Sequence, residues 1–100
     1  MRTGNYDTGR LIHGVRQLNQ FYFEEEFIEN LGSRYIRCCS GEESPGIFTG
    51  RVTGYLNQLT VIPADIKYYL CGKALMVVET RDILIERGVP FSNILSEIYF

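Results

Sequence analysis

Metal-binding and disulfide-forming residues are scarce in this sequence. It has one histidine, His13, and three cysteines, of which Cys38 and Cys39 are adjacent. Neighbouring cysteines rarely bridge each other, and a zinc site needs more histidine or cysteine ligands at wider spacing. The sequence therefore argues against a zinc centre and against any paired disulfide framework. We interpret Cys38 and Cys39 as small hydrophobic residues in a reducing compartment.

No charge of one sign dominates, and no hydrophobic run is long. Lys and Arg number 10 against 12 Asp and Glu, so the formal net charge is -2. A nucleic-acid or anionic-membrane surface needs clustered Lys and Arg. No apolar stretch approaches the roughly 20 residues of a membrane span, and the first residues form no hydrophobic signal segment. We therefore expect a cytoplasmic protein with neither a nucleic-acid nor a membrane partner.

The composition is that of a single globular domain. Apolar residues make up 45% and charged residues 22% of the 100 residues, close to the average for folded proteins. The sequence has no repeats and no internal linker. Residues 1–9 are polar and rich in glycine, so we expect a flexible N-terminal segment followed by one domain over residues 10–100.

Short apolar runs alternate with helical periodicity along the domain. The apolar runs predict strands over residues 11–15, 35–39, 67–71 and 94–99. Spacings of three and four residues predict a helix over 17–31 with a stop at Gly32, and a second from Val52 to Leu59 with Thr49 as cap. A third helix is predicted after the Cys71-Gly72 turn, with Met76, Ile83 and Leu84 on one face, Leu75 and Val78 beside it, and a stop at Gly88. Residues 41–49 are predicted to be a loop. This alternation indicates an α/β fold with a parallel sheet and flanking helices.

Three predicted strands end in turns that contain a small residue. The turns lie at residues 14–16, 40–42 and 71–73. The carboxyl ends of parallel strands share one edge of the sheet, where open α/β sheets bind their ligands. A glycine at such a turn lets a ligand approach the backbone closely, although it also serves ordinary turns. We therefore expect any binding site at this edge.

Several side chains near these turns carry useful chemistry. Arg16 has the geometry to pair with a phosphate or stack on adenine, or else to form a surface ion pair with a helix glutamate. Ser40 either donates its hydroxyl to a sugar or phosphate, or caps a loop. Lys73 either meets an anion or is simply solvated. Glu97, if buried, has a raised pKa suited to proton transfer, and otherwise lies exposed at a frayed terminus.

Six segments in a fixed order carry a further signal. They are Leu11 to Arg16, Phe23 to Phe27, Gly50 to Thr53, Tyr69 to Gly72 with Met76 and Val77, Gly88 to Pro90 with Asn93 and Ile94, and Glu97 to Phe100. Together they resemble the C-terminal, NAD(P)-binding domain of the ferredoxin–NADP reductase superfamily. The resemblance implies a flavin-dependent oxidoreductase that moves hydride between NAD(P)H and FAD and exchanges electrons with a carrier such as ferredoxin or flavodoxin.

The resemblance also implies roles for individual residues. The cofactor-binding positions would be Gly14, Val15, Arg16 and Ser40 at the adenosine phosphate end, Gly72 and Met76 at the nicotinamide turn, and Tyr99 near the flavin. The catalytic positions would be Cys71, which approaches the nicotinamide, and Glu97, near the flavin ring. Members that prefer NADP often have arginine after the serine, where this chain has Gly41, so the choice between NAD and NADP stays open.

Two parts of the family pattern are missing from the sequence. There is no FAD-binding barrel with its flavin motif, and no Gly-x-Gly phosphate loop with the first strand that precedes it. The resemblance therefore implies a partial NAD(P)-binding domain that is inactive by itself. A non-catalytic nucleotide-binding or protein-interaction module is the alternative, and an α/β domain without a ligand is a third.

The missing strand has a structural consequence. In the superfamily's strand order, 3-2-1-4-5, the first strand is central, so its loss leaves an incomplete sheet with two open inner edges. Each buried unpaired backbone group costs roughly 1–3 kcal/mol. We therefore expect the strands either to close up on one another or to recruit a second copy through the open edge.

Overall fold

A five-stranded parallel sheet organises the chain. The computed structural model describes residues 9–21 and 24–98, so most of the predicted flexible segment lies outside the described residues. The strand order is β3-β2-β1-β4-β5. The strands are β1 (Arg10–Val15), β2 (Tyr35–Cys39), β3 (Phe48–Thr49), β4 (Tyr68–Gly72) and β5 (Ile94–Ile98). The predicted α/β class with a parallel sheet and flanking helices is confirmed.

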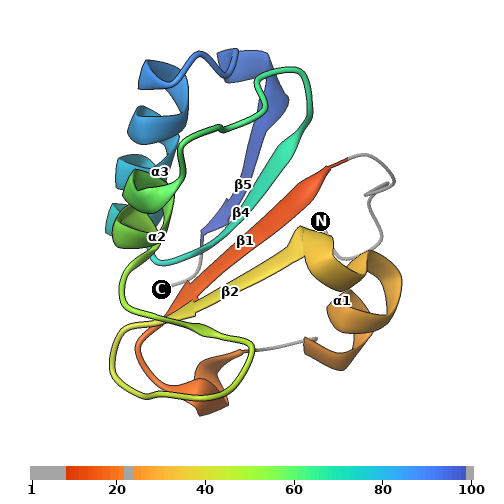
Figure 1. Ribbon diagram of the computed structural model, residues 1–100, viewed down its shortest axis with the longest axis vertical. Coiled ribbons are helices and arrows are strands. Elements are labelled where there is room, and N and C mark those ends of the chain that lie inside the picture. Colours follow the sequence, from red (N-terminus) through yellow and green to blue (C-terminus); the bar gives the residue numbers. More distant parts are fainter. Residues whose placement is uncertain (1–8, 22–23, 99–100) are drawn as a thin grey trace.

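The helices cover both faces of the sheet. Helix α1 (Glu24–Leu31) lies on one face, and helices α2 (Val52–Gln58) and α3 (Ala74–Glu86) lie on the other (Figure 1). Short 3-10 turns occur at Leu18–Gln20, Gly32–Arg34 and Phe91–Asn93. None of the described helices is long and apolar enough to cross a lipid bilayer.

The centre of the sheet is occupied, which corrects the expectation of an incomplete sheet. β1 pairs with β2 on one side, where Ile12 is in register with Ile36, and with β4 on the other, where Ile12 is in register with Leu70. The observed order is the complete order 3-2-1-4-5, with β1 at the centre, so the expectation that the first strand is missing was wrong. The backbone of β1 has neighbours on both sides, which avoids the cost of unpaired inner edges. A second copy is not needed to complete the sheet.

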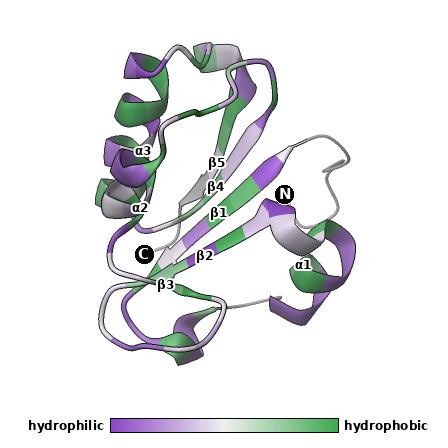
Figure 2. Cartoon of the chain, in the orientation of Figure 1, coloured by the Kyte–Doolittle hydropathy of each residue, from purple (hydrophilic) through white to green (hydrophobic). Residues whose placement is uncertain are grey.

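The core consists of two layers, one on each face of the sheet. The larger layer lies under α2 and α3 and the smaller under α1, and Figure 2 shows the apolar residues of the strands between the two sets of helices. Residues of β1 alternate between the layers, since Ile12 joins the larger and Leu11 the smaller. A strand buried on both faces is typical of the middle of a parallel sheet.

Three local predictions differ from the structure. The helix expected over 17–31 begins only at Glu24, after a separate 3-10 turn at Leu18–Gln20. The predicted loop over 41–49 contains β3, which is too short to show periodicity. Thr49 belongs to that strand and is not a helix cap. Arg51 occupies the N-cap position of α2 and makes no side-chain capping bond.

Helix α3 packs its expected face, Met76, Ile83 and Leu84, against the larger core layer, but the residues expected beside that face do not share its burial. Val77, Thr80 and Leu84 are buried, whereas Leu75 and Val78 are exposed and Ile83 is only partly buried. The predicted stop is confirmed: Gly88 has φ +98°. The amide of Val89 donates to the carbonyl oxygen of Leu84 over 2.9 Å, as in a left-handed helix terminus.

The buried face of α3 generates a first prediction. Thr80 is fully buried and its hydroxyl oxygen makes no hydrogen bond. Replacing an unpaired buried hydroxyl by a methyl group of the same shape removes a desolvation cost. Thr80→Val should raise the free energy of unfolding in urea by about 1 kcal/mol. The matched control, Val77→Thr on the same face, should lower it, and a destabilised Thr80→Val would contradict this account of the helix.

Candidate functional site

The carboxyl ends of three neighbouring strands meet at one edge of the sheet. Val15 at the end of β1 is in register with Cys39 at the end of β2, and His13 is in register with Cys71 near the end of β4. The amide of Ser40 donates to the carbonyl oxygen of Val15 over 3.0 Å, which ties the first two turns together. The sequence-based expectation of a shared edge therefore agrees with the register of the sheet.

A cavity of about 450 Å³ opens at this edge. Its size lies within the range of small-molecule sites. Twelve residues line it: Gly14, Val15, Arg16, Gln20, Cys38, Ser40, Gly50, Arg51, Val52, Lys73, Leu75 and Met76. Five of the seven predicted cofactor-binding positions are therefore in this wall, and the cavity lies on the face of the sheet that α2 and α3 cover.

Two glycines allow the tight packing beside the cavity. A Cβ atom at Gly14 would lie 2.7 Å from Cγ2 of Val52 and 3.2 Å from Cε of Met76. A Cβ atom at Gly72 would overlap Sδ of Met76 and lie 3.3 Å from the carbonyl oxygen of Gly14. Neither position has room for a side chain. Met76 therefore packs directly on the backbone at the ends of β1 and β4.

The cavity wall is basic. It contains Arg16, Arg51 and Lys73, and none of its lining residues is acidic. All three cations are exposed. Arg51 forms an ion pair with Glu79 over 3.3 Å, whereas Arg16 forms no ion pair within the described part of the chain. The alternative in which Arg16 pairs with a helix glutamate is therefore not observed. Such a wall favours an anionic ligand.

Steric packing explains the glycine after Ser40. A Cβ atom at Gly41 would overlap the carbonyl oxygen of Arg16. An arginine, which the resemblance would have placed here for NADP, does not fit without moving the turn after β1. The hydroxyl of Ser40 itself is exposed and makes no hydrogen bond with the described residues. It is therefore available to a ligand in the cavity.

The main-chain amides after β1 are already bonded to side chains. The amides of Arg16 and Gln17 donate to Oε1 of Gln20 over 3.0 and 2.9 Å. The amide of Leu18 donates to Oε1 of Glu42 over 2.7 Å. In a dinucleotide-binding fold the amides of this first turn bind the pyrophosphate. Here Gln20 and Glu42 occupy them, which accords with the missing glycine-rich loop.

The cysteines have different environments. Cys38 lines the cavity, and burial raises the pKa of its thiol to about 12, so it is a neutral, apolar part of the wall at physiological pH. Cys71, predicted to be catalytic, is 1% exposed and is not among the lining residues. Its side chain belongs to the smaller core layer, on the α1 face. The backbone of Cys71 reaches the shared edge, but its thiol does not reach the cavity.

The structure does not describe the side chains of the two residues predicted to lie near the flavin, Glu97 and Tyr99. Glu97 belongs to β5, with its Cα in register with Cys71, and nothing further is described of it. Tyr99 lies outside the described residues. Both assignments stay predictions. Among the residues that the structure describes, no group of three His, Cys, Asp or Glu side chains is placed to hold a metal ion.

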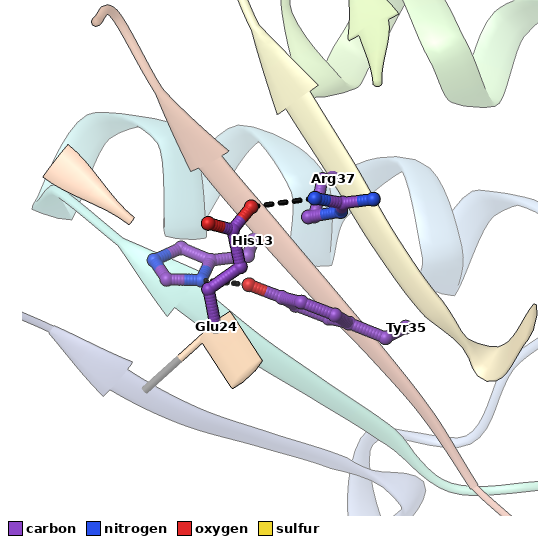
Figure 3. A network of polar contacts seen from close by, with 4 residues as sticks. All are labelled: His13, Glu24, Tyr35 and Arg37. Carbon is purple, nitrogen blue, oxygen red and sulfur yellow. Dashed lines mark hydrogen bonds and ion pairs between the residues drawn. The ribbon is translucent and has the colours of Figure 1, made fainter. Parts of the chain in front are cut away.

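A polar network on the opposite face stabilises α1 against the sheet (Figure 3). Nδ1 of the buried His13 lies 3.0 Å from the hydroxyl of Tyr35. Nη1 of Arg37 lies 2.5 Å from Oε2 of Glu24 at the start of α1. Because His13 and Arg37 are in register on β1 and β2, the network joins α1 to both strands. His13 is therefore a structural residue on the far side of the sheet from the cavity.

Sequence reasoning missed the α2 side of the cavity. Gly50, Arg51 and Val52 line it because β3 brings the chain back to the end of β2, where the amide of Gly50 donates to the carbonyl oxygen of Cys39 over 2.8 Å. The segment from Gly50 to Thr53 was matched to the family without a role. The sequence signal that could have identified this part of the site is a glycine and a basic residue, Gly50 and Arg51, directly before a predicted helix.

The fold is similar to that of a solved structure. That structure is described as the flavohem-like FAD/NAD-binding domain of nitric oxide dioxygenase from Vibrio cholerae O1 biovar El Tor. The TM-score is 0.66 and the sequence identity 12%, over 96% of this chain and 53% of that chain. No protein-family model matches the sequence, and no curated protein matches it significantly.

The likeness establishes the fold and no more. The parallel sheet and flanking helices are similar to those of the matched FAD/NAD-binding domain, which agrees with the fold that the resemblance implies. At 12% identity the likeness carries no activity with it, and the chain spans about half the length of the matched structure. The flavin and electron-transfer parts of the resemblance therefore enter only as proposals.

The packing around Gly72 generates a second prediction. Gly72→Ala should lower the free energy of unfolding by about 1 kcal/mol or more, because the new Cβ displaces Met76. The matched control is Gly54→Ala in α2, where the nearest heavy atom to a Cβ is 3.9 Å away and alanine should stabilise the helix. In a Met76→Ala background the cost of Gly72→Ala should shrink. An unchanged cost in that background would contradict the contact.

Proposed function

We propose that this chain is the nicotinamide-nucleotide-binding part of a flavin-dependent NAD(P)H oxidoreductase. The observation that supports the proposal is the basic cavity at the shared carboxyl edge of β1, β2 and β4. Ligands of open α/β sheets bind at this edge. The similarity in fold to an FAD/NAD-binding domain agrees with the same assignment.

The cavity fits the adenosine phosphate end of a nicotinamide nucleotide. Arg16 and Ser40 were the predicted contacts there, and Arg51 and Lys73 add two cations to the same wall. Guanidinium groups bind phosphate oxygens in pairs, and lysine adds a point charge. Val15 and Gly14 contribute backbone surface to that end. The free hydroxyl of Ser40 suits a ribose or phosphate oxygen.

The nicotinamide end would approach the turn at Gly72. Met76, which lines the cavity, packs directly on Gly72, so this turn lies behind the cavity wall. The thiol of Cys71 is buried on the α1 face and does not line the cavity, so only the backbone of Cys71 would contribute to this turn. The nucleotide, when bound, supplies a hydride to FAD in the intact enzyme. FAD would be held mainly by a domain beyond this chain, with Glu97 and Tyr99 beside its ring.

A non-catalytic nucleotide-binding module is the second candidate. The observation that favours it is the set of amides after β1 that Gln20 and Glu42 already occupy. Without them, a bound dinucleotide lacks most of its pyrophosphate contacts. We therefore expect dissociation constants in the millimolar range or weaker for NADH and NADPH, on the order of 4 kcal/mol of binding free energy or less.

The chain offers a matched test of the cavity. Its two lysines lie at opposite ends of β4, Lys73 in the cavity wall and Lys67 before the strand begins. In an amide chemical-shift titration with adenosine 2′,5′-bisphosphate, Lys73→Ala should weaken binding roughly fivefold or more by removing a phosphate contact. Lys67→Ala should leave binding unchanged. Arg16→Ala and Arg51→Ala should act like Lys73→Ala.

The outcomes separate the candidates. Binding of NADH or NADPH with shifts at Gly14, Ser40 and Gly72 supports a nicotinamide site. If the bisphosphate binds, and NADH and NADPH cause no shift at Gly72, the result supports a nucleotide-binding module. Equal effects of Lys73→Ala and Lys67→Ala, or no shifts with any of the three ligands, would refute the cavity as a nucleotide site.

A further inference from the structure

The two edges of the sheet differ in their readiness to pair with another strand. β3 has only two residues and is flanked by Gly46 and Gly50, both with positive φ. β5 (Ile94–Ile98) has five residues, with neither proline nor lysine among them, and within the described residues it pairs only with β4. Very short strands, proline and charged side chains protect an edge from adding a further strand, and β5 carries only one of these, the charged Glu97. β5 is therefore the edge that can pair.

Helix α3 adds an apolar surface beside this edge. The side of α3 toward α2 is identified by two contacts, the ion pair of Glu79 with Arg51 and the hydrogen bond from Arg87 to the carbonyl oxygen of Leu59. Val78 and Ile85 lie seven residues apart on a different side, 38% and 43% exposed. Because α3 contacts β4 and β5, this flank lies along the open edge of the sheet.

We propose that β5 and this flank of α3 form a two-fold interface with a second copy of the chain. Two β5 strands would pair antiparallel about an axis near Ser96, the middle residue of the strand. The same axis brings the two α3 helices together in opposite directions. Val78 then packs on Ile85 of the second copy, and the two sheets become one sheet of ten strands.

The spacing of sheets and helices fits this arrangement. Neighbouring strands lie about 4.8 Å apart, and α3 contacts both β4 and β5. Two helices placed in this way on either side of a β5–β5 pair would be about 10 Å apart, close to the distance of packed helices. The apolar flanks therefore come into contact once the strands pair.

The charges on the flank favour a second copy of the chain over a partner whose surface is strongly positive or strongly negative. Arg81 and Asp82 are adjacent between Val78 and Ile85, and their side chains lie 3.9 Å apart. An antiparallel pair of α3 helices brings Arg81 of one copy toward Asp82 of the other. A surface with one cation, one anion and two aliphatic side chains is self-complementary, and it has no net charge to attract a strongly charged partner.

Sedimentation of the 100-residue chain from micromolar to millimolar concentration tests the interface. We expect a concentration-dependent species of twice the 11.5 kDa mass of the chain. Ile85→Glu should raise the dissociation constant of the dimer about tenfold or more, because it buries two carboxylates. Ile28→Glu is the matched control: Ile28 lies on α1 and is 44% exposed, but is remote from the proposed interface, so the dimer should be unaffected.

A cross-linking experiment locates the axis independently. Ser96→Cys should form a disulfide-linked dimer with oxidised glutathione, since directly opposed residues of an antiparallel pair are within disulfide reach. Ser33→Cys, exposed beside α1, is the control that should not. The three native cysteines are buried and give little background. A chain that stays monomeric at all concentrations would overturn the proposal, as would a dimer that Ile28→Glu weakens and Ile85→Glu does not.

Discussion

The pairing of β1 with β4 is the interaction on which the rest of the structure depends. The two strands are far apart in the sequence, and their register, with Ile12 opposite Leu70, sets the height of every turn at the carboxyl edge. If that pairing were absent, β1 and β4 would each have a row of backbone N–H and C=O groups without partners. Each such group that stays buried costs roughly 1–3 kcal/mol. Closing the sheet removes that cost within a single chain.

The same pairing separates a binding face from a structural face. On the α2 and α3 side, the small residues Gly14 and Gly72 leave room for Met76, and three cations surround the cavity. On the α1 side, His13 and Cys71 are buried within the sheet, and the Glu24–Arg37 ion pair fixes the helix. Alternation along one strand therefore divides residues that are neighbours in the sequence between the two tasks.

The sequence predicted the parts of this arrangement that follow from local patterns. Apolar runs located four of the five strands, and Gly32 and Gly88 marked helix ends, because these signals are contained within a few residues. The role of Arg51 was not predictable in the same way, since it depends on β3, a two-residue strand held by pairing with β2. The direction of the Cys71 thiol depends on which face of β4 meets α1, and no local pattern fixes that.

A nuclear Overhauser experiment on the isotopically labelled chain tests the central pairing most directly. Intramolecular contacts between the backbones of Ile12 and Leu70, and between those of His13 and Cys71, are the predicted result, together with slow amide exchange along β1. The contrary result is that these contacts are missing, or that they appear only between a labelled and an unlabelled copy. In that case the sheet does not close within one chain, and the strand ends that line the cavity are not held side by side.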